Sequence, residues 1–318
     1  MTTGPGIFGL KTLARSYVNG CGRWMRNPLG RPMWQMNSLD LSRAGGIGDV
    51  LMCTPALREV KRLNQNCVIR FYTGFPSLVR GLPWIDEVLP FEARPLDDLY
   101  LGYDYAIPPY AAKPPTEHLA RFIGRQLDVE LSDVRPACIV DQVLVNSFLS
   151  MWRDLPGPRI VIGRHASAFT PNKEWMGEAW SELIERLLGF CSVIEIGDRM
   201  ESDAEVTAKN YVDLRGRTSL DQLVAAIAAA DLCVGPISGP IHIAAAVGKP
   251  SVVVYGGYEH PSNTTYPGNI TFYTPTPCAP CWLREPCPYD RKCLRAITPS
   301  MVEQAVAQQV QSLNAGVI

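Results

Sequence analysis

Apolar and polar positions alternate along this chain in a way that predicts short buried strands separated by helices. In the second half, apolar runs at residues 159–163, 192–196, 232–235 and 251–255 have the continuity of parallel strands buried on both faces. Apolar residues recur at helical spacing in residues 178–188, 202–210, 220–230, 241–247 and 302–313. Strand and helix alternating in this order predict a parallel sheet covered on both faces by helices.

The first half shows the same alternation less clearly. Strands are predicted at residues 39–42, 67–72 and 103–107, and helices at residues 50–63, 117–127 and 142–155. A stretch with two prolines and a glycine, residues 154–158, is the best linker candidate. We therefore predict an appendage at 1–37 and two Rossmann-like domains at 38–156 and 157–318, with ligands in the crevice between two facing sheets.

Composition narrows the class of protein. The chain has 318 residues, of which 47% are hydrophobic and 19% charged, and its net charge is −1. That balance is typical of a globular protein and argues against nucleic-acid binding, which needs a basic surface. Since apolar runs are too short for a membrane span and the N-terminus lacks a signal-peptide core, we expect a cytoplasmic location.

The N-terminal appendage carries five basic residues and no acidic residue before Leu39. Its apolar residues recur at helical spacing over residues 7–26, with the basic residues largely between them. Such a helix can lie on the anionic cytoplasmic face of the inner membrane as a peripheral contact. The alternative is a helix packed on the protein's own surface or on a partner subunit.

Two glycine-containing turns, nearly 200 residues apart, each stand between a strand-like run and a helical run. They are Arg43-Ala-Gly-Gly-Ile-Gly-Asp49 and Gly235-Pro-Ile-Ser-Gly-Pro-Ile-His242. Unpaired backbone N–H groups and the helix dipole at such turns favour negative charge. The pair predicts an enzyme that holds a phosphorylated substrate between its two halves. A nicotinamide-dependent oxidoreductase is less favoured, because neither turn has the full dinucleotide fingerprint.

Several side chains near these turns allow two interpretations each. Asp49 could accept a proton from an incoming hydroxyl, or it could only cap its helix. Ser167, Thr170 and Lys173 form a candidate diphosphate cradle, or an exposed polar loop. Glu201 could accept hydrogen bonds from ribose hydroxyls or only open a helix, and His242 could contact a phosphate or only pack between apolar neighbours.

Four of the ten cysteines, Cys278, Cys281, Cys287 and Cys293, lie within sixteen positions of one another. In a reducing compartment such a cluster indicates a metal site more often than disulfides, and four thiolates suit a structural zinc or iron ion. The alternative is four reduced thiols in a proline-containing loop.

Five stretches of the chain resemble, in order, the motifs of glycosyltransferase family 9, the lipopolysaccharide heptosyltransferases. They are Arg43-Ala-Gly-Gly-Ile-Gly-Asp-Val-Leu-Met-Cys-Thr-Pro-Ala-Leu57, Lys173-Glu-Trp175, Asp213-Leu-Arg-Gly216, Ser238-Gly-Pro-Ile-His-Ile-Ala-Ala245 and Tyr255-Gly256. The resemblance covers about residues 39–310. It implies a GT-B fold of two Rossmann-like domains, an ADP-sugar donor that is typically ADP-heptose, and inversion without a catalytic metal or cofactor.

The resemblance also implies roles for particular residues. Asp49 would be the general base, and the donor would be bound by Gly46, Gly48, Ser167, Lys173, Glu201, Ser238, Gly239, His242 and Gly256. The first domain would hold the acceptor, which is a glycolipid, glycan or protein of the cell envelope. Ile237 departs from the pattern, because many members carry an acidic residue there. The rival hypothesis is a non-catalytic sugar-nucleotide-binding or scaffold protein of the same fold.

Overall fold

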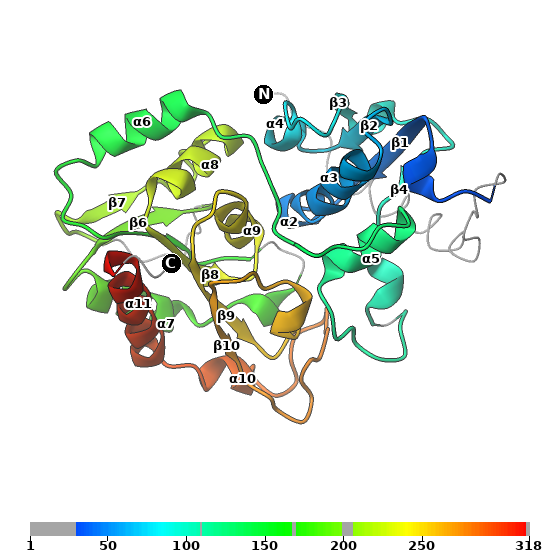
Figure 1. The fold of residues 1–318 in the computed structure, drawn as a ribbon. Coiled ribbons are helices and arrows are strands. Elements are labelled where there is room, and N and C mark those ends of the chain that lie inside the picture. The colour runs from blue at the N-terminus through cyan, green and yellow to red at the C-terminus, as the bar shows by residue number, and fades with distance from the viewer. Residues whose placement is uncertain (1–29, 109, 167–169, 199–205, 316–318) are drawn as a thin grey trace, which may run out of the picture.

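The computed structural model describes residues 30–108, 110–166, 170–198 and 206–315, and these residues form two parallel α/β sheets (Figure 1). The basic segment 7–26, with its proposed membrane contact, lies outside the described residues. Just before the first sheet, the 3-10 turn η1 (Met33–Gln35) is held by the Asn64 amide, which donates to the carbonyl oxygens of Trp34 and Met36.

The first sheet has four parallel strands in the order β3-β2-β1-β4. Their bounds are β1 (Ser38–Arg43), β2 (Val68–Thr73), β3 (Glu87–Pro90) and β4 (Leu99–Tyr100). The helices of this half are α2 (Ile47–Leu51), α3 (Thr54–Leu63), α4 (Pro76–Val79) and α5 (Leu119–Gln126), with 3-10 turns η2 (Phe91–Ala93) and η3 (Asp104–Ala106).

The second sheet has six parallel strands in the order β10-β9-β8-β5-β6-β7. They are β5 (Arg159–Gly163), β6 (Ser192–Ile196), β7 (Tyr211–Asp213), β8 (Leu232–Pro236), β9 (Ser251–Gly256) and β10 (Ile270–Tyr273). The remaining helices are α6 (Gln142–Met151), α7 (Gly177–Leu187), α8 (Leu220–Ala229), α9 (Gly239–Ala246), α10 (Lys292–Arg295) and α11 (Pro299–Asn314), with 3-10 turns η4 (Pro171–Lys173) and η5 (Pro261–Asn263). Two parallel α/β sheets confirm the predicted architecture.

Alternate residues of the second sheet face two separate apolar layers. Val161, Ile194 and Val253 pack with apolar side chains of α8 and α9, whereas Ile160 and Val252 pack with those of α7 and α11. All five are fully buried. The period-two alternation of a strand therefore divides continuous apolar runs between two covered faces, which is why both faces of these strands are mainly apolar.

Three predicted elements differ from the structure. Residues 103–107 were expected to form a strand but contain η3, because the following Pro108 cannot donate to a sheet ladder. The single helix predicted at 50–63 is two helices, α2 and α3, since Pro55 in the first turn of α3 favours a new helix start. Residues 206–210 of the predicted helix 202–210 are not helical. The Asn210 amide instead donates to the carbonyl oxygens of Leu188 and Cys191.

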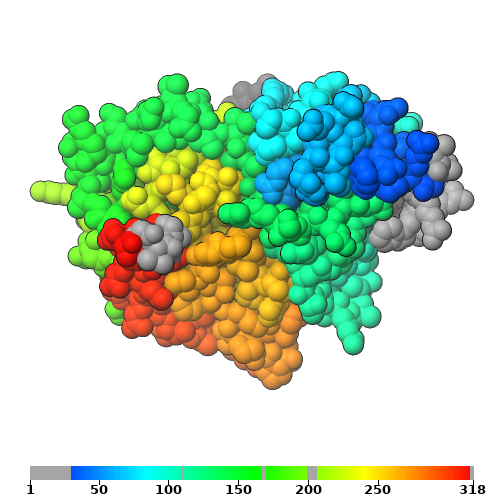
Figure 2. Space-filling model, in the orientation of Figure 1, coloured from blue at the N-terminus to red at the C-terminus, as the bar shows by residue number. Residues whose placement is uncertain are grey.

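The two halves touch at several places. Helix α2 packs against α9, α4 packs against α8, and the Asn263 amide donates to the carbonyl oxygens of Pro115 and Glu117. In Figure 2 the teal-to-green surface near residue 120 accordingly borders the orange surface near residue 260. These contacts bring the turn after β1 to the turn after β8. Within the described residues, no helix combines the length and apolarity needed to cross a bilayer.

Candidate active site

The turn between β1 and α2 is built around the Asp49 side chain. Gly46 is the N-cap residue of α2, and its N–H donates to Asp49 Oδ2 at 2.7 Å. Gly45 has a φ of +111°, and a Cβ atom added there would meet Asp49 Oδ2. Helix capping by Asp49 is therefore confirmed, and the glycine at position 45 leaves one side of that oxygen without a side chain.

The other carboxylate oxygen of Asp49 is bound by two side chains that sequence patterns did not single out. Arg43 Nη2 donates to Oδ1 at 2.7 Å, and the Tyr103 hydroxyl donates to the same oxygen. Arg43 is only 3% exposed, while the Asp49 side chain is 25% exposed. Tyr103 is the N-cap residue of η3 and was predicted in a strand, so its hydroxyl could not have been placed beside Asp49.

These contacts determine the charge state of Asp49. Burial by itself raises the pKa of the carboxyl group, but the charge of Arg43 and the hydrogen bonds from Tyr103, Arg43 and Gly46 outweigh it. The pKa of Asp49 is therefore lowered from its ordinary value of 3.8. The carboxylate is ionised at neutral pH and is held in one orientation with a partly exposed edge.

Residues of the second turn lie directly against the first. A Cβ atom added to Gly48 would collide with the His242 ring, and one added to Gly239 would crowd Ile47. Both glycines thus allow α2 and α9 to approach closely. The Ser238 hydroxyl donates to Pro236 O, so among the described residues no side chain caps the N-terminus of α9.

His242 lies near a charged group from each half. Its ring is 5% exposed, and its Nδ1 is 2.7 Å from the Tyr266 hydroxyl. Burial lowers the pKa of His242 to about 4, with the charge of Asp49 opposing this shift and that of Lys173 adding to it. The imidazole is therefore a neutral packed side chain whose pKa depends on the charge of Asp49 in the first half and of Lys173 in the second.

Lys173 forms an ion pair with a carboxylate far from it in the sequence. Its Nζ is 2.6 Å from Oε1 of Glu259, which is 2% exposed, and it lies 4.9 Å from the Tyr258 ring centre. The lysine remains 21% exposed. A buried carboxylate thus holds the ammonium group in place while leaving part of it accessible.

The loop that carries Lys173 is closed at its base by Glu174. The Glu174 carboxylate accepts a hydrogen bond from Ala166 N at 2.7 Å and is 3.0 Å from His165 Nδ1. Thr170, which was expected in the diphosphate cradle, donates its hydroxyl to Leu283 O instead. The predicted donor residues Ser167 and Glu201 lie outside the described residues.

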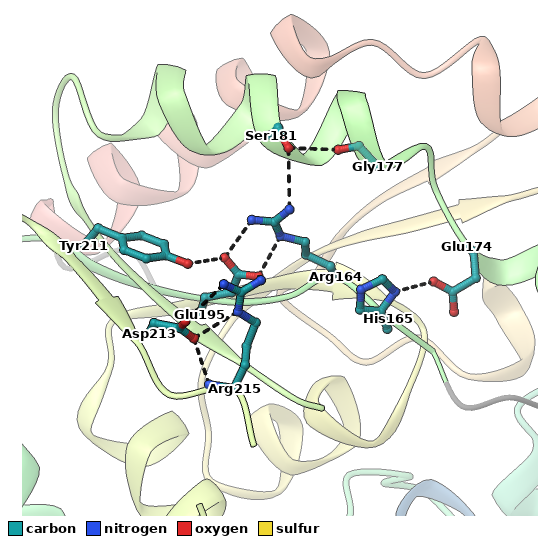
Figure 3. A network of polar contacts seen from close by, with 9 residues as sticks. All are labelled: Arg164, His165, Glu174, Gly177, Ser181, Glu195, Tyr211, Asp213 and Arg215. Carbon is teal, nitrogen blue, oxygen red and sulfur yellow. Dashed lines mark hydrogen bonds and ion pairs between the residues drawn. The ribbon is translucent and has the colours of Figure 1, made fainter. Parts of the chain in front are cut away.

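Figure 3 shows a buried network beside this loop that sequence reasoning missed. Glu195 is fully buried in β6, with Arg164 Nε at 2.6 Å and Arg215 Nη1 at 3.1 Å from its Oε1. Tyr211 donates to Glu195 Oε2, and Asp213 binds the other face of Arg215. The network joins the carboxyl ends of β5 and β7 through β6. A charged residue in an otherwise apolar strand was the available signal.

Gly256 and the four clustered cysteines lie in segments next to the Lys173 site. Gly256 has a φ of +62°, and a side chain there would collide with Leu294. The pKa of Cys281 is raised by burial and by the neighbouring thiols of Cys293, Cys278 and Cys287, which therefore lie near it. Four thiols match the ligand preference of zinc or iron. Their arrangement does not: no group of three or more potential ligands among the described residues is placed to hold an ion.

Two buried histidines at the junction of the halves predict an acid-sensitive fold. Burial lowers the pKa of His118 to about 3 and that of His242 to about 4, below the ordinary 6.5. His118 Nδ1 also accepts the N-cap hydrogen bond of α5 from Ala120 N, which requires a neutral ring. Between pH 6.5 and 4 the unfolded chain binds protons that the folded chain does not. The contribution of these two histidines to the free energy of unfolding is therefore fully present above pH 6.5 and is lost as the pH falls toward 4.

We expect the free energy of unfolding to fall by about 2 kcal/mol for each of these histidines between pH 7 and pH 5. Urea unfolding at both pH values measures this loss in the wild-type protein and in the double variant His118→Gln/His242→Gln. The double variant should lose less stability than the wild type over this interval. His260→Gln, at an exposed histidine, is the matched control. Equal losses in the double variant and the wild type would refute the prediction.

Comparison with known proteins identifies the family of the chain. The family model of glycosyltransferase family 9 (heptosyltransferase) matches residues 126–292, just over half of the chain. Lipopolysaccharide core heptosyltransferase OpsX of Haemophilus influenzae is 31% identical over 109 residues. That alignment covers 31% of this chain and only 30% of the relative, so the chain matches less than a third of the relative's length.

Two solved structures share the fold. The dodecameric iron-containing heptosyltransferase TibC of enterotoxigenic Escherichia coli, in complex with ADP-D-beta-D-heptose, is 20% identical with a TM-score of 0.64, over 87% of this chain and 78% of that one. E. coli ADP-heptose lipopolysaccharide heptosyltransferase II is 17% identical with a TM-score of 0.61, over 87% and 99%. At these identities the likeness concerns the fold, and it confirms the predicted GT-B architecture.

Proposed function

The chain belongs to glycosyltransferase family 9, and from this we propose that it transfers a heptose from ADP-heptose to a hydroxyl group of a cell-envelope glycolipid, glycan or protein. The family supports glycosyl transfer in general. ADP-heptose is chosen because it is the sugar nucleotide bound in the TibC structure. The acceptor class follows OpsX, which acts on the lipopolysaccharide core by its name.

One observation carries the proposal. The charges of Asp49, from the first half, and Lys173, from the second, both act on the pKa of the same His242 ring. A candidate base from one half and a candidate diphosphate-binding cation from the other thus both lie near one buried side chain, whose ring also packs against Gly48 beside Asp49. Transfer from a nucleotide-sugar requires this pairing, because a proton is removed at the acceptor while negative charge develops on the leaving diphosphate.

In the proposed reaction Asp49 accepts the proton of the acceptor hydroxyl. Its Oδ1 is occupied by Arg43 and Tyr103, and its Oδ2 receives one hydrogen bond from Gly46. Oδ2 therefore keeps a lone pair, and the Asp49 side chain is partly exposed. The acceptor oxygen then forms a bond to the anomeric carbon as the bond to the diphosphate breaks, which inverts the configuration at that carbon.

Positive potential for the leaving group would come from the second half. Lys173 supplies a partly exposed ammonium group, and the N-terminus of α9 supplies the positive end of a helix dipole. We propose that these groups stabilise ADP without a catalytic metal ion. Gly46, Gly48, Ser238, Gly239, His242 and Gly256, with Ser167 and Glu201, remain the predicted donor-binding residues.

Replacing Lys173 by alanine should weaken ADP binding by roughly 10- to 100-fold, the usual cost of losing a charge-assisted hydrogen bond. Isothermal titration calorimetry measures the dissociation constant. Lys209→Ala, at an exposed lysine of the same half, is the matched control and should bind ADP as the wild type does. An unchanged affinity in Lys173→Ala would remove this residue from the donor site.

The four clustered cysteines form a separate proposal. We propose that Cys278, Cys281, Cys287 and Cys293 hold one structural zinc or iron ion, because four clustered thiols match the ligand preference of these metals. No catalytic step passes through it. Metal analysis of purified protein should find about one ion per chain, which the double variant Cys278→Ser/Cys281→Ser should lose. Wild-type protein without zinc or iron would contradict the proposal.

A ligand panel followed by an assay tests the function itself. ADP-, GDP-, UDP- and dTDP-sugars are compared for thermal stabilisation, since a ligand that binds only the folded form raises Tm. ADP-heptose should give the largest shift. Transfer to a candidate acceptor is then assayed, and NMR of the product shows whether the anomeric configuration is inverted. If only another nucleotide-sugar stabilised the protein, ADP-heptose would be the wrong donor. Binding without transfer to any acceptor would favour the scaffold alternative.

A further inference from the structure

Asn172, next to Lys173, is bound to the cysteine segment, which we define as residues 278–293. Its Nδ2 donates to the carbonyl oxygens of Leu283 and Glu285, each at 2.8 Å, and its Oδ1 accepts from Cys287 N at 3.1 Å. The Asn172 side chain is 4% exposed, and all three contacts run across more than 100 residues of sequence. One amide therefore ties the turn η4, where Lys173 lies, to the cysteine segment.

The cysteine segment also holds the residues on the other side of Lys173. Cys281 N donates to Gly257 O, and Trp282 N donates to Tyr258 O, both at 3.0 Å. The Trp282 ring lies 5.4 Å from that of Tyr258, the residue whose ring faces the Lys173 ammonium group. Glu259, the ion-pair partner of Lys173, is the next residue along the chain. The segment thus braces both η4 and the strand end that receives its lysine.

From this arrangement we infer that Asn172 is a positioning residue, through which the cysteine segment holds Lys173 in place for the diphosphate of a nucleotide. The inference rests on the proposed function. A lysine side chain has several rotatable bonds, and its contribution to binding depends on where its backbone is held. Loss of the Asn172 amide frees η4 from the segment. Ordering Lys173 when ADP binds would then cost conformational entropy and weaken binding.

A double-mutant cycle distinguishes positioning from general stabilisation. ADP dissociation constants are measured by calorimetry for the wild type, Asn172→Ala, Lys173→Ala and the double variant, at a temperature where each is folded. Asn172→Ala should weaken ADP binding about tenfold in the wild type and less than about twofold when Lys173 is already alanine. Equal effects in the two backgrounds, or no effect in the wild type, would overturn the inference.

Asn210→Ala is the matched control. Its amide donates to two carbonyl oxygens, of Leu188 and Cys191, at the opposite edge of the same sheet. It should lower Tm without changing ADP affinity, and a loss of affinity comparable to that of Asn172→Ala would count against the inference. If Asn172→Ala does not fold, Thr170→Val replaces it in the same cycle. This variant removes the hydroxyl bond to Leu283 O and should weaken ADP binding about threefold.

Hydrogen–deuterium exchange separates this inference from the proposed function, because it needs no nucleotide. Asn172→Ala should accelerate exchange both at residues 170–174 and in the cysteine segment, whereas Asn210→Ala should do neither. Unchanged exchange in these two stretches would refute the inference that Asn172 holds η4 to the cysteine segment, and would leave the proposed function intact. Failure of wild-type protein to bind ADP or any other nucleotide diphosphate would overturn the proposed function, and the inference with it.

Discussion

Asp49→Asn should slow glycosyl transfer by about 100- to 10,000-fold, the usual contribution of a positioned general base. The substitution keeps the size of the side chain and removes the charge that accepts the proton. ADP affinity should stay within about threefold of the wild type, because the donor diphosphate is proposed to bind Lys173 and α9 on the other half. Single-turnover rates with saturating donor, together with calorimetry of ADP, measure the two quantities separately.

Asp104→Asn provides the control for Asp49. Asp104 Oδ2 is 3.5 Å from Arg43 Nη1, so this variant also removes a negative charge beside the same arginine. The Asp104 side chain is 50% exposed and does not contact the cap of α2 through its carboxylate. Its transfer rate should stay close to that of the wild type. If the two variants were equally active, Asp49 would be only a helix cap, and the general base would have to be sought elsewhere.

Glu195→Ala should give the largest loss of stability among the changes considered, about 3–5 kcal/mol. It leaves the guanidinium groups of Arg164 and Arg215 in a buried site without the carboxylate between them. Both arginines are at most 3% exposed, so water cannot replace the lost partner. Thermal unfolding followed by circular dichroism should show a decrease in Tm on the order of 10 °C.

A surface ion pair of the same chemistry gives the comparison. Glu182 binds Arg186 at 2.8 Å, with side chains that are 51% and 41% exposed. Glu182→Ala should cost no more than about 1 kcal/mol, because exposed pairs are solvated in both the folded and unfolded states. Equal decreases in Tm for the two variants would mean that the buried network contributes no more than a surface contact.

The sequence predicted the second half of the fold better than the first. Strands β5 and β6 were predicted with the bounds that the structure shows, because continuous apolar runs between helices are a local signal. The first half was harder, since β3, β4 and α4 are short and carry little periodicity. The strand predicted at 103–107 failed for a related reason. Tyr103, Ala106 and Ile107 are buried, but burial alone does not distinguish a strand from a 3-10 turn.

The candidate site shows the same division. Glycine turns and the family motifs brought Asp49, Lys173 and His242 to attention, since each belongs to a recognisable local pattern. Tyr103 and Glu259 were not assigned their partners, because these contacts join positions 54 and 86 residues apart along the chain. Asn172, which directly precedes the Lys173-Glu-Trp175 motif, shows its connection to the cysteine segment only in three dimensions.

What the sequence determined by itself is therefore the family, the two α/β halves and the identity of the charged groups at the glycine turns. These features depend on residue type and on spacing within about fifteen positions, which the chain displays directly. Tertiary structure alone decided which groups meet: Arg43 and Tyr103 on Asp49, Glu259 on Lys173, and Glu195 between two arginines. The physical reason is that the charge state and orientation of a side chain depend on neighbours supplied by distant segments.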